Sequence, residues 1–295
     1  MRILVAGASG FIGTELSRQL EADGHTVLRL VRHSPTSSDE YLWMPKDLTV
    51  DPRAIEAADV VINLAGATTG RIPWTTGYKR EILYSRVLGT QTLAEAIGRA
   101  TDPPTVFLNG SAVGYYGDRP GETLTEESSK GTGFLSDVVE AWEQAARLTP
   151  AGTRLVMFRT GLVVGKGGAF TPIVPLTKLG LATRFGTGRQ NWPWISVYDE
   201  AAAIRHLITS QLEGVVNLAG PIPATAGEIT DGLAEALHRW HLLVAPTFAV
   251  DVLGDAGRDL LLSSQASSPA RLLADGFTFR HQTVNDALSE LAREL

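Results

Sequence analysis

A glycine-rich turn directly after the first apolar segment is the feature that most restricts how this chain can fold. Residues 5–13 read Val-Ala-Gly-Ala-Ser-Gly-Phe-Ile-Gly, so three glycines stand three positions apart at Gly7, Gly10 and Gly13. A buried strand, such a turn and then a helix form the pyrophosphate-binding unit of Rossmann-type folds. The first glycine permits the tight turn, the second lets the backbone approach the phosphates, and the third lets the helix pack closely on the sheet. An ordinary turn is the alternative, but the apolar run before it and the amphipathic stretch after it favour a dinucleotide site.

Strand-like and helix-like segments then alternate through the first half of the chain. Short apolar runs predict parallel strands, and amphipathic stretches between them predict helices. The predicted strands cover residues 3–6, 26–31, 59–64, 106–109, 154–159 and 214–218, and the predicted helices cover about 11–23, 78–99, 133–148 and 199–209. This order predicts an α/β fold, a Rossmann-type doubly wound parallel sheet with its ligand at the carboxyl ends of the strands.

The alternation breaks after about Gly165, where glycine, proline and tryptophan become dense. We expect residues 1–165, with 195–220 returning to them, to form the dinucleotide-binding Rossmann domain. Residues 166–194 and 221–295 are expected to form a smaller, mostly helical substrate-binding lobe, which ends in an amphipathic helix.

Composition excludes several classes of partner. The formal net charge is −6, which gives no basis for binding nucleic acid or an anionic membrane surface. The chain has no cysteine, which rules out disulfides and thiolate chemistry, and its six histidines are scattered, so we predict no metal site. The first strand begins at once and no apolar run is long enough to span a bilayer, so we expect a cytoplasmic protein that binds a small molecule.

The end of the second predicted strand indicates which dinucleotide fits. NAD-binding versions of this fold place a carboxylate there to hold the ribose 2′-hydroxyl, whereas this chain has Val31 followed by Arg32. A guanidinium binds a 2′-phosphate that a carboxylate would repel, so Arg32 favours NADP(H). A solvated surface arginine is the alternative.

Several motifs resemble those of the extended short-chain dehydrogenases/reductases. They are the glycine turn, Asn63-Leu64-Ala65-Gly66, and Ser111-Ala112-Val113-Gly114-Tyr115-Tyr116-Gly117. Four further segments are similar to those of an atypical branch of this superfamily. They are Trp74-Thr75, Ser85-Arg86-Val87, the segment from Gly186 to Ile195 and the segment from Pro269 to Phe279. This is the NADP-linked "epimerase family", also labelled SulA-like, which has its own C-terminal domain.

The resemblance implies NADP(H) contacts from the glycine turn, from the end of the second predicted strand, from the residues after the predicted strands 59–64 and 154–159, and from the helix near 78–99. These residues are Gly7, Gly10, Phe11, Ile12, Gly13, Val31, Arg32, Leu64, Ala65, Gly66, Glu81, Arg86 and Val163. On its own, Glu81 would be interpreted as a solvated helix residue. The resemblance also allows a homodimer paired through the helices near 78–99 and 133–148.

The chain departs from the broad superfamily in its acid/base residues. Short-chain dehydrogenases normally use a Tyr-x-x-x-Lys pair, in which the lysine lowers the pKa of the tyrosine. Leu135 and Val139 stand at those positions when Glu143 is aligned with the usual glutamate, and no tyrosine in the chain has a lysine four residues later. The remaining candidate proton donors are Ser111, Tyr115 and Tyr116, for which packing and loop hydrogen bonds are an equal alternative.

The second half adds aromatic candidates for a substrate pocket. Trp74, Trp192 and Trp194, with Arg189 and Gln190, could line a cleft that stacks on a ring and binds an anion, although most tryptophans are core residues. Two functions therefore stand open. One is an NADP(H)-dependent epimerase or oxidoreductase acting on a small, sugar-like molecule, and the other is a non-catalytic NADP(H)-binding sensor or regulatory protein.

Overall fold

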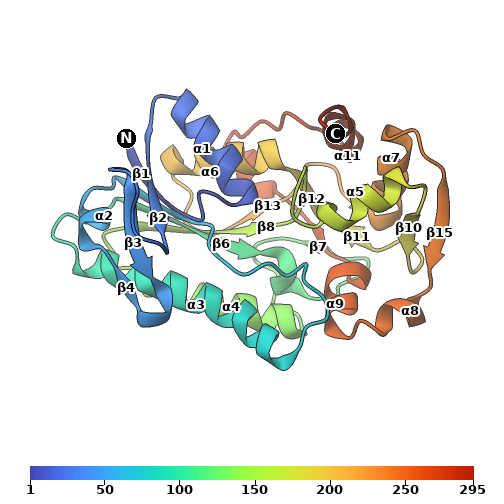
Figure 1. The fold of residues 1–295 in the computed structure, drawn as a ribbon, viewed down its shortest axis with the longest axis horizontal. Coiled ribbons are helices and arrows are strands. Elements are labelled where there is room, and N and C mark those ends of the chain that lie inside the picture. The colour runs from blue at the N-terminus through green and yellow to red at the C-terminus, as the bar shows by residue number, and fades with distance from the viewer.

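An eight-stranded sheet runs through the centre of the protein (Figure 1). We describe it from a computed structural model that covers residues 1–295, of which the side chains of His241 and Leu242 are not described. The strand order is β13-β8-β6-β5-β1-β2-β3-β4, and every neighbouring pair is parallel except β3 with β4. The strands are β1 (Arg2–Ala6), β2 (Thr26–Val31), β3 (Glu40–Met44), β4 (Thr49–Val50), β5 (Val60–Asn63), β6 (Val106–Ala112), β8 (Arg154–Thr160) and β13 (Gly214–Leu218).

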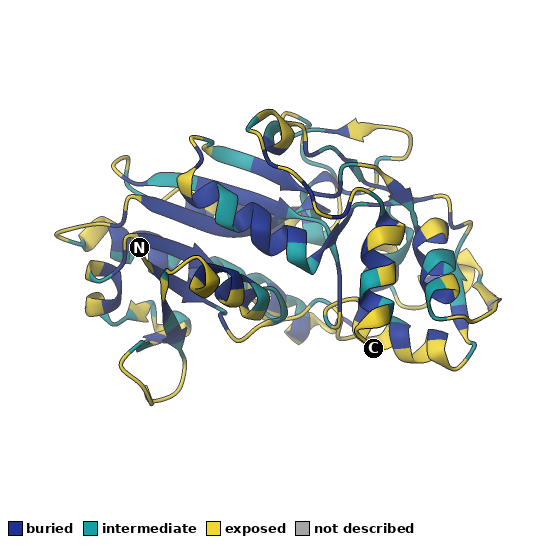
Figure 2. Ribbon diagram, turned by 90° about the horizontal axis from the view of Figure 1, so that it is seen from above, coloured by how far each residue is buried: buried dark blue, intermediate teal, exposed yellow. Residues whose placement is uncertain are grey.

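The sheet separates two apolar cores. Its inner strands are buried on both faces, as expected for parallel strands covered by helices on each side (Figure 2). Alternate residues of β1 show this, because Ile3 and Val5 belong to one core while Leu4 and Ala6 belong to the other. Each set packs under a different helical layer.

Two helix pairs cover the two faces (Figure 1). Helices α1 (Phe11–Ala22) and α6 (Val197–Thr209) pack together on one face, and α3 (Thr76–Arg99) and α4 (Phe134–Ala146) pack together on the other. The short helix α2 (Pro52–Glu56) precedes β5. None of the helices in the described part combines the length and apolar character needed to cross a membrane.

The C-terminal lobe is built from short elements. Its helices are α5 (Phe170–Lys178), α7 (Ala226–Ala236), α8 (Thr247–Asp251), α9 (Asp255–Gly257), α10 (Ala270–Ala274) and α11 (Val284–Arg293). Helices α5, α7 and α11 pack around an apolar cluster separate from the two cores of the sheet. Two-stranded pairings join β10 (Ala182–Phe185) to β15 (His241–Ala245), β11 (Asn191–Trp192) to β14 (Ala224–Thr225), β12 (Trp194–Ser196) to β9 (Leu162–Val164), and β16 (Ala266–Ser267) to β7 (Thr123–Leu124).

The predicted fold class is confirmed: the protein is an α/β protein with a Rossmann-type parallel sheet and a mostly helical C-terminal part. Strand β2 matches its predicted bounds, and β13 adds to the edge of the main sheet beside β8, although it lies far along the chain. The prediction missed β3, whose five residues show only one fully buried side chain, Trp43. It also ended β6 at Asn109, whereas the strand continues to Ala112.

Candidate cofactor and substrate site

The glycine turn joins β1 to α1 so tightly that Gly7 and Gly13 have no room for a side chain. Gly7 has φ +84°, in the left-handed region, and Gly10 N donates to Gly7 O at 2.9 Å. A Cβ on Gly13 would collide with the carbonyl oxygen of Gly7, so helix and turn are in direct contact. Gly10 forms the N-cap of α1 and no side chain caps that helix, which leaves its first N–H groups available to an anion.

The loop after β5 lies against the same turn. A Cβ on Gly7 would stand 3.0 Å from the backbone carbon of Leu64 and 3.1 Å from Ala65 N. Ala65 N donates to Asn63 Oδ1 at 3.1 Å, and Asn63 Nδ2 donates to Asn109 Oδ1 at 2.8 Å, inside the sheet. These buried hydrogen bonds fix the loop at the point between β1 and β5 where Rossmann sheets bind their ligands.

Arg86 is a half-buried cation beside this loop. Its Nη1 donates to the carbonyl oxygens of Ala67 and Ile82 at 3.0 and 3.1 Å, and its guanidinium lies 5.2 Å from the centre of the Trp142 ring. Burial lowers the pKa of Arg86 to about 10, and the guanidinium forms no ion pair with any described residue. A half-buried guanidinium without a carboxylate partner can bind an anionic ligand.

The remaining predicted cofactor residues lie around the same edge of the sheet. Phe11 places its ring against the loop of Gly165 and Gly167, where a Cβ on either glycine would come within 2.6 Å of it. Val163 is half-buried in β9, and Glu81 is exposed on α3. Arg32 is exposed directly after β2 and makes no hydrogen bond or ion pair with the described residues.

A buried ion pair occupies the centre of the predicted acid/base region. Arg159 Nε and Nη2 donate to Glu143 Oε1 and Oε2 at 2.7 and 2.9 Å, and both side chains are almost fully buried. Ser111 Oγ donates to the same Glu143 Oε1 at 2.7 Å. The Arg159 guanidinium lies 3.5 Å from the centre of the Tyr115 ring.

Two of the three candidate proton donors are engaged in internal hydrogen bonds. Ser111 is held by Glu143, and Tyr116 is fully buried and donates to Asn217 Oδ1 at 2.7 Å. Burial raises the pKa of Tyr116, so its hydroxyl stays protonated. Tyr115 differs, because it is half-buried and its hydroxyl makes no hydrogen bond within the described part. The proton-donor role of all three residues stays a prediction, and Tyr115 is the one whose hydroxyl has no hydrogen-bond partner in the described part.

The five predicted substrate residues lie in different surroundings, and their role in binding a substrate stays a prediction. Trp74 packs edge-on against Phe134, near the start of α4. Trp192 and Trp194 belong to the core of the C-terminal lobe instead. Gln190 Nε2 donates to two backbone carbonyls, whereas Arg189 is exposed.

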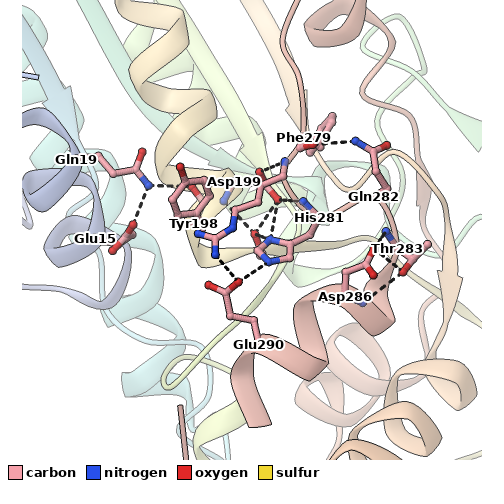
Figure 3. Close-up of polar contacts among 12 residues, drawn as sticks. Glu15, Gln19, Tyr198, Asp199, Phe279, His281, Gln282, Thr283, Asp286 and Glu290 are labelled. Carbon is pink, nitrogen blue, oxygen red and sulfur yellow. Dashed lines mark hydrogen bonds and ion pairs between the residues drawn. The ribbon is translucent and has the colours of Figure 1, made fainter. Parts of the chain in front are cut away.

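Sequence reasoning also missed a buried polar cluster that joins α6 to α11 (Figure 3). His281 Nδ1 lies 2.9 Å from Ser196 Oγ and 3.1 Å from Asp199 Oδ2, and its Nε2 lies 2.9 Å from Glu290 Oε2. The Asp199 carboxylate also accepts from the backbone N–H groups of Arg280 and His281. The cluster holds the C-terminal segment against the Rossmann sheet. No group of metal-ligating side chains was found in the described part of the chain.

The sheet, the uncapped start of α1 and the half-buried cation near β5 define a Rossmann-type protein with the elements of a dinucleotide site. Residues 3–219 match the NAD dependent epimerase/dehydratase family, and residues 245–291 match a domain of unknown function, DUF1731. The chain therefore belongs to the epimerase/dehydratase family and to its atypical extended short-chain dehydrogenase/reductase branch, which confirms the resemblance.

Similar proteins share the full length of the chain. An epimerase family protein of Mycobacterium leprae is 38% identical over 291 residues, which cover 97% of this chain and 94% of the relative. The crystal structure of human epimerase family protein SDR39U1 with NADPH is 33% identical, covers 100% of both chains and has a TM-score of 0.92. A nucleoside-diphosphate sugar epimerase from Corynebacterium glutamicum is 30% identical with a TM-score of 0.79, covering 99% of this chain and 58% of that one.

Proposed function

We propose that the protein binds NADP(H) in the crevice between β1 and β5 and uses it as an oxidoreductase or epimerase. The observation that carries the proposal is the glycine turn in contact with the loop of Leu64 and Ala65, because a dinucleotide pyrophosphate needs such a backbone cradle. The human relative crystallised with NADPH supports the same cofactor.

The residues around the crevice fit the charges of NADP(H). The uncapped start of α1 suits the pyrophosphate, and Arg86 adds a half-buried positive charge that lacks an anionic partner among the described residues. Arg32, exposed after β2, suits the 2′-phosphate that distinguishes NADP(H) from NAD(H). When bound, the cofactor donates or accepts a hydride, while the protein supplies orientation and proton transfer.

The substrate proposed is a small, sugar-like molecule, held near Tyr115 and Trp74. Tyr115 offers the hydroxyl that is not used internally, and Trp74 contributes an apolar wall with Phe134. The name of the Corynebacterium glutamicum relative, a nucleoside-diphosphate sugar epimerase, supports a sugar-like substrate. We extend the proposal to a homodimer through α3 and α4 and to the cytoplasm.

A non-catalytic NADP(H)-binding sensor is the second candidate. It is favoured by Leu135 and Val139, apolar residues at the positions of the usual Tyr-x-x-x-Lys pair, which pack against the backbone at Gly114. In that case the C-terminal lobe would report cofactor binding to a partner and no hydride would be transferred.

Two measurements test these functions in sequence. Calorimetric titration of the full chain with NADPH and NADH should show binding of both, with NADPH tighter; no binding of NADPH contradicts the cofactor proposal. A screen of carbonyl compounds and sugars that follows NADPH absorbance should then reveal turnover. Binding without any absorbance change across the screen would favour the sensor.

A further inference from the structure

The C-terminal lobe places a carboxylate at the start of α4, where the usual acid/base tyrosine is missing. Leu135 N donates to Asp259 Oδ2 at 3.1 Å, and Leu135 stands at the position of that tyrosine. The two residues are 124 positions apart, so only the folded lobe brings them together. Asp259 lies on a single π-helical turn (Arg258–Leu262), a local geometry that is frequent at functional sites.

Only one oxygen of Asp259 is used by the protein. Oδ2 accepts from Leu135, whereas Oδ1 makes no hydrogen bond within the part of the chain that the structure describes. Oδ1 faces Gly133, where an added Cβ would stand 3.4 Å away, and Gly133 has φ +119°, a conformation suited to glycine. Because Gly133 has no side chain, no Cβ contacts this oxygen from that position.

The surroundings favour a carboxyl group that can hold a proton. Asp259 is half-buried beside the apolar cluster of Trp74, Leu135 and Leu260. Burial raises the pKa of Asp259, and the nearby Asp255 raises it further. The Leu135 N–H group and the charges of Lys79 and Arg258 lower the pKa, but the net shift is upward. Lys79 is itself paired with Asp255, and Arg258 with Asp251, so neither cation is committed to Asp259.

We propose that Asp259 is the general acid and base of this protein, in place of the Tyr-x-x-x-Lys pair; this rests on the proposed enzymatic function. A bound reduced cofactor would supply the hydride that the substrate's carbonyl carbon takes up. Asp259 Oδ1 gives its proton to the carbonyl oxygen, which becomes a hydroxyl, and the resulting carboxylate regains a proton from water. In the oxidative direction the carboxylate accepts the hydroxyl proton, and the hydride would pass to the oxidised cofactor.

The competing role is structural, because a carboxylate at a helix N-terminus also acts as a cap. Such a cap needs only an acceptor oxygen and is most favourable when ionised. Asp259→Asn keeps an acceptor for Leu135 N and removes titration, so it separates the two roles. Asp137→Asn is the matched control. Asp137 lies in the first turn of α4, the helix that Asp259 would cap, and its side chain is 70% exposed.

The test follows the titration of Asp259 directly in the full chain. Aspartate carboxyls carrying ¹³C are titrated by NMR with and without NADPH, and the signal lost in Asp259→Asn identifies Asp259. We expect a midpoint above the ordinary aspartate value and a shift of that midpoint when NADPH binds. By linkage, the NADPH affinity of Asp259→Asn should change by no more than the factor that this shift implies, and that of Asp137→Asn should not change. A midpoint below the ordinary value, or one insensitive to bound NADPH, would show a cap and overturn the inference.

The same samples keep the two proposals apart. If wild-type protein does not bind NADPH, the proposed function is contradicted, and the inference about Asp259 that rests on it is contradicted with it. If NADPH binds and Asp259 does not respond, only the present inference fails. With a substrate from the screen, Asp259→Asn should lower turnover about 10²–10⁴-fold and Asp137→Asn should not; equal turnover in wild type and Asp259→Asn would also refute the role.

Discussion

His281 Nδ1 lies 3.1 Å from Asp199 Oδ2, and this buried pair joins the C-terminal segment to the first turn of α6 (Figure 3). The other ring nitrogen faces Glu290 Oε2 at 2.9 Å, and Glu290 also pairs with Arg280. Asp199 raises the pKa of His281, Glu290 adds to that effect, and burial opposes it. Hydrogen bonds from His281 and from the backbone hold the pKa of Asp199 below its ordinary value despite burial.

These directions predict how stability depends on pH. Protonated His281 contributes fully below the ordinary imidazole pKa, and its contribution is lost as pH rises through the raised pKa of the folded state. Ionised Asp199 contributes above the ordinary aspartate pKa and loses its contribution as pH falls through its lowered pKa. The pair is therefore strongest between those two ordinary values, about pH 4 to 6.5.

His281→Gln should lower the free energy of unfolding by about 3 kcal/mol at pH 6, because it leaves Asp199 buried without its cation. The loss should shrink at higher pH, where the wild-type ring is neutral. Urea denaturation at several pH values measures both effects, with His33→Gln at an exposed position as the control. A loss in His281→Gln that stays constant across pH would contradict a charged pair.

Arg32→Asp should weaken NADPH binding about 10–100-fold, the equivalent of one charge-assisted contact to the 2′-phosphate, and change NADH binding much less. The cause is the replacement of an exposed guanidinium by a carboxylate that repels the phosphate. Arg53→Asp, at another exposed arginine, is the control. Equal losses for NADPH and NADH in Arg32→Asp would remove the proposed role of this residue.

The sequence predicted the Rossmann sheet because its signals are local: a glycine turn, apolar runs and helical periodicity lie within short segments. Side-chain direction at the site was harder to predict. Strand β6 continues through Ser111, so strand alternation turns this hydroxyl toward Glu143 of α4 rather than into an open loop. The contact of Asp259 with Leu135 and that of Asp199 with His281 join distant segments, and no local pattern encodes them.

Glu143→Gln should destabilise the protein by about 3–5 kcal/mol, because it leaves the buried Arg159 guanidinium without its charged partner. Glu95→Gln is the matched control on the neighbouring helix α3, where the partner Arg99 is 68% exposed, and it should cost less than about 0.5 kcal/mol. Denaturant unfolding of both variants measures the difference. Similar values for the two would show that the Glu143–Arg159 pair adds little to stability.

Gly13→Ala should disrupt the dinucleotide turn, since its Cβ would collide with Gly7 O and force α1 away from β1. We expect a loss of about 1–3 kcal/mol in the free energy of unfolding, typical of overpacking, together with a large loss of NADPH affinity. Gly98→Ala is the control in which the same methyl group meets no neighbour. Gly98 is an exposed residue of α3, and no atom lies within 4 Å of its added Cβ. That variant should gain about 0.5–1 kcal/mol from helix propensity and bind NADPH normally. Because both changes add the same methyl group within a helix, undiminished NADPH affinity in Gly13→Ala would mean that the close contact of α1 with the turn is not needed for binding.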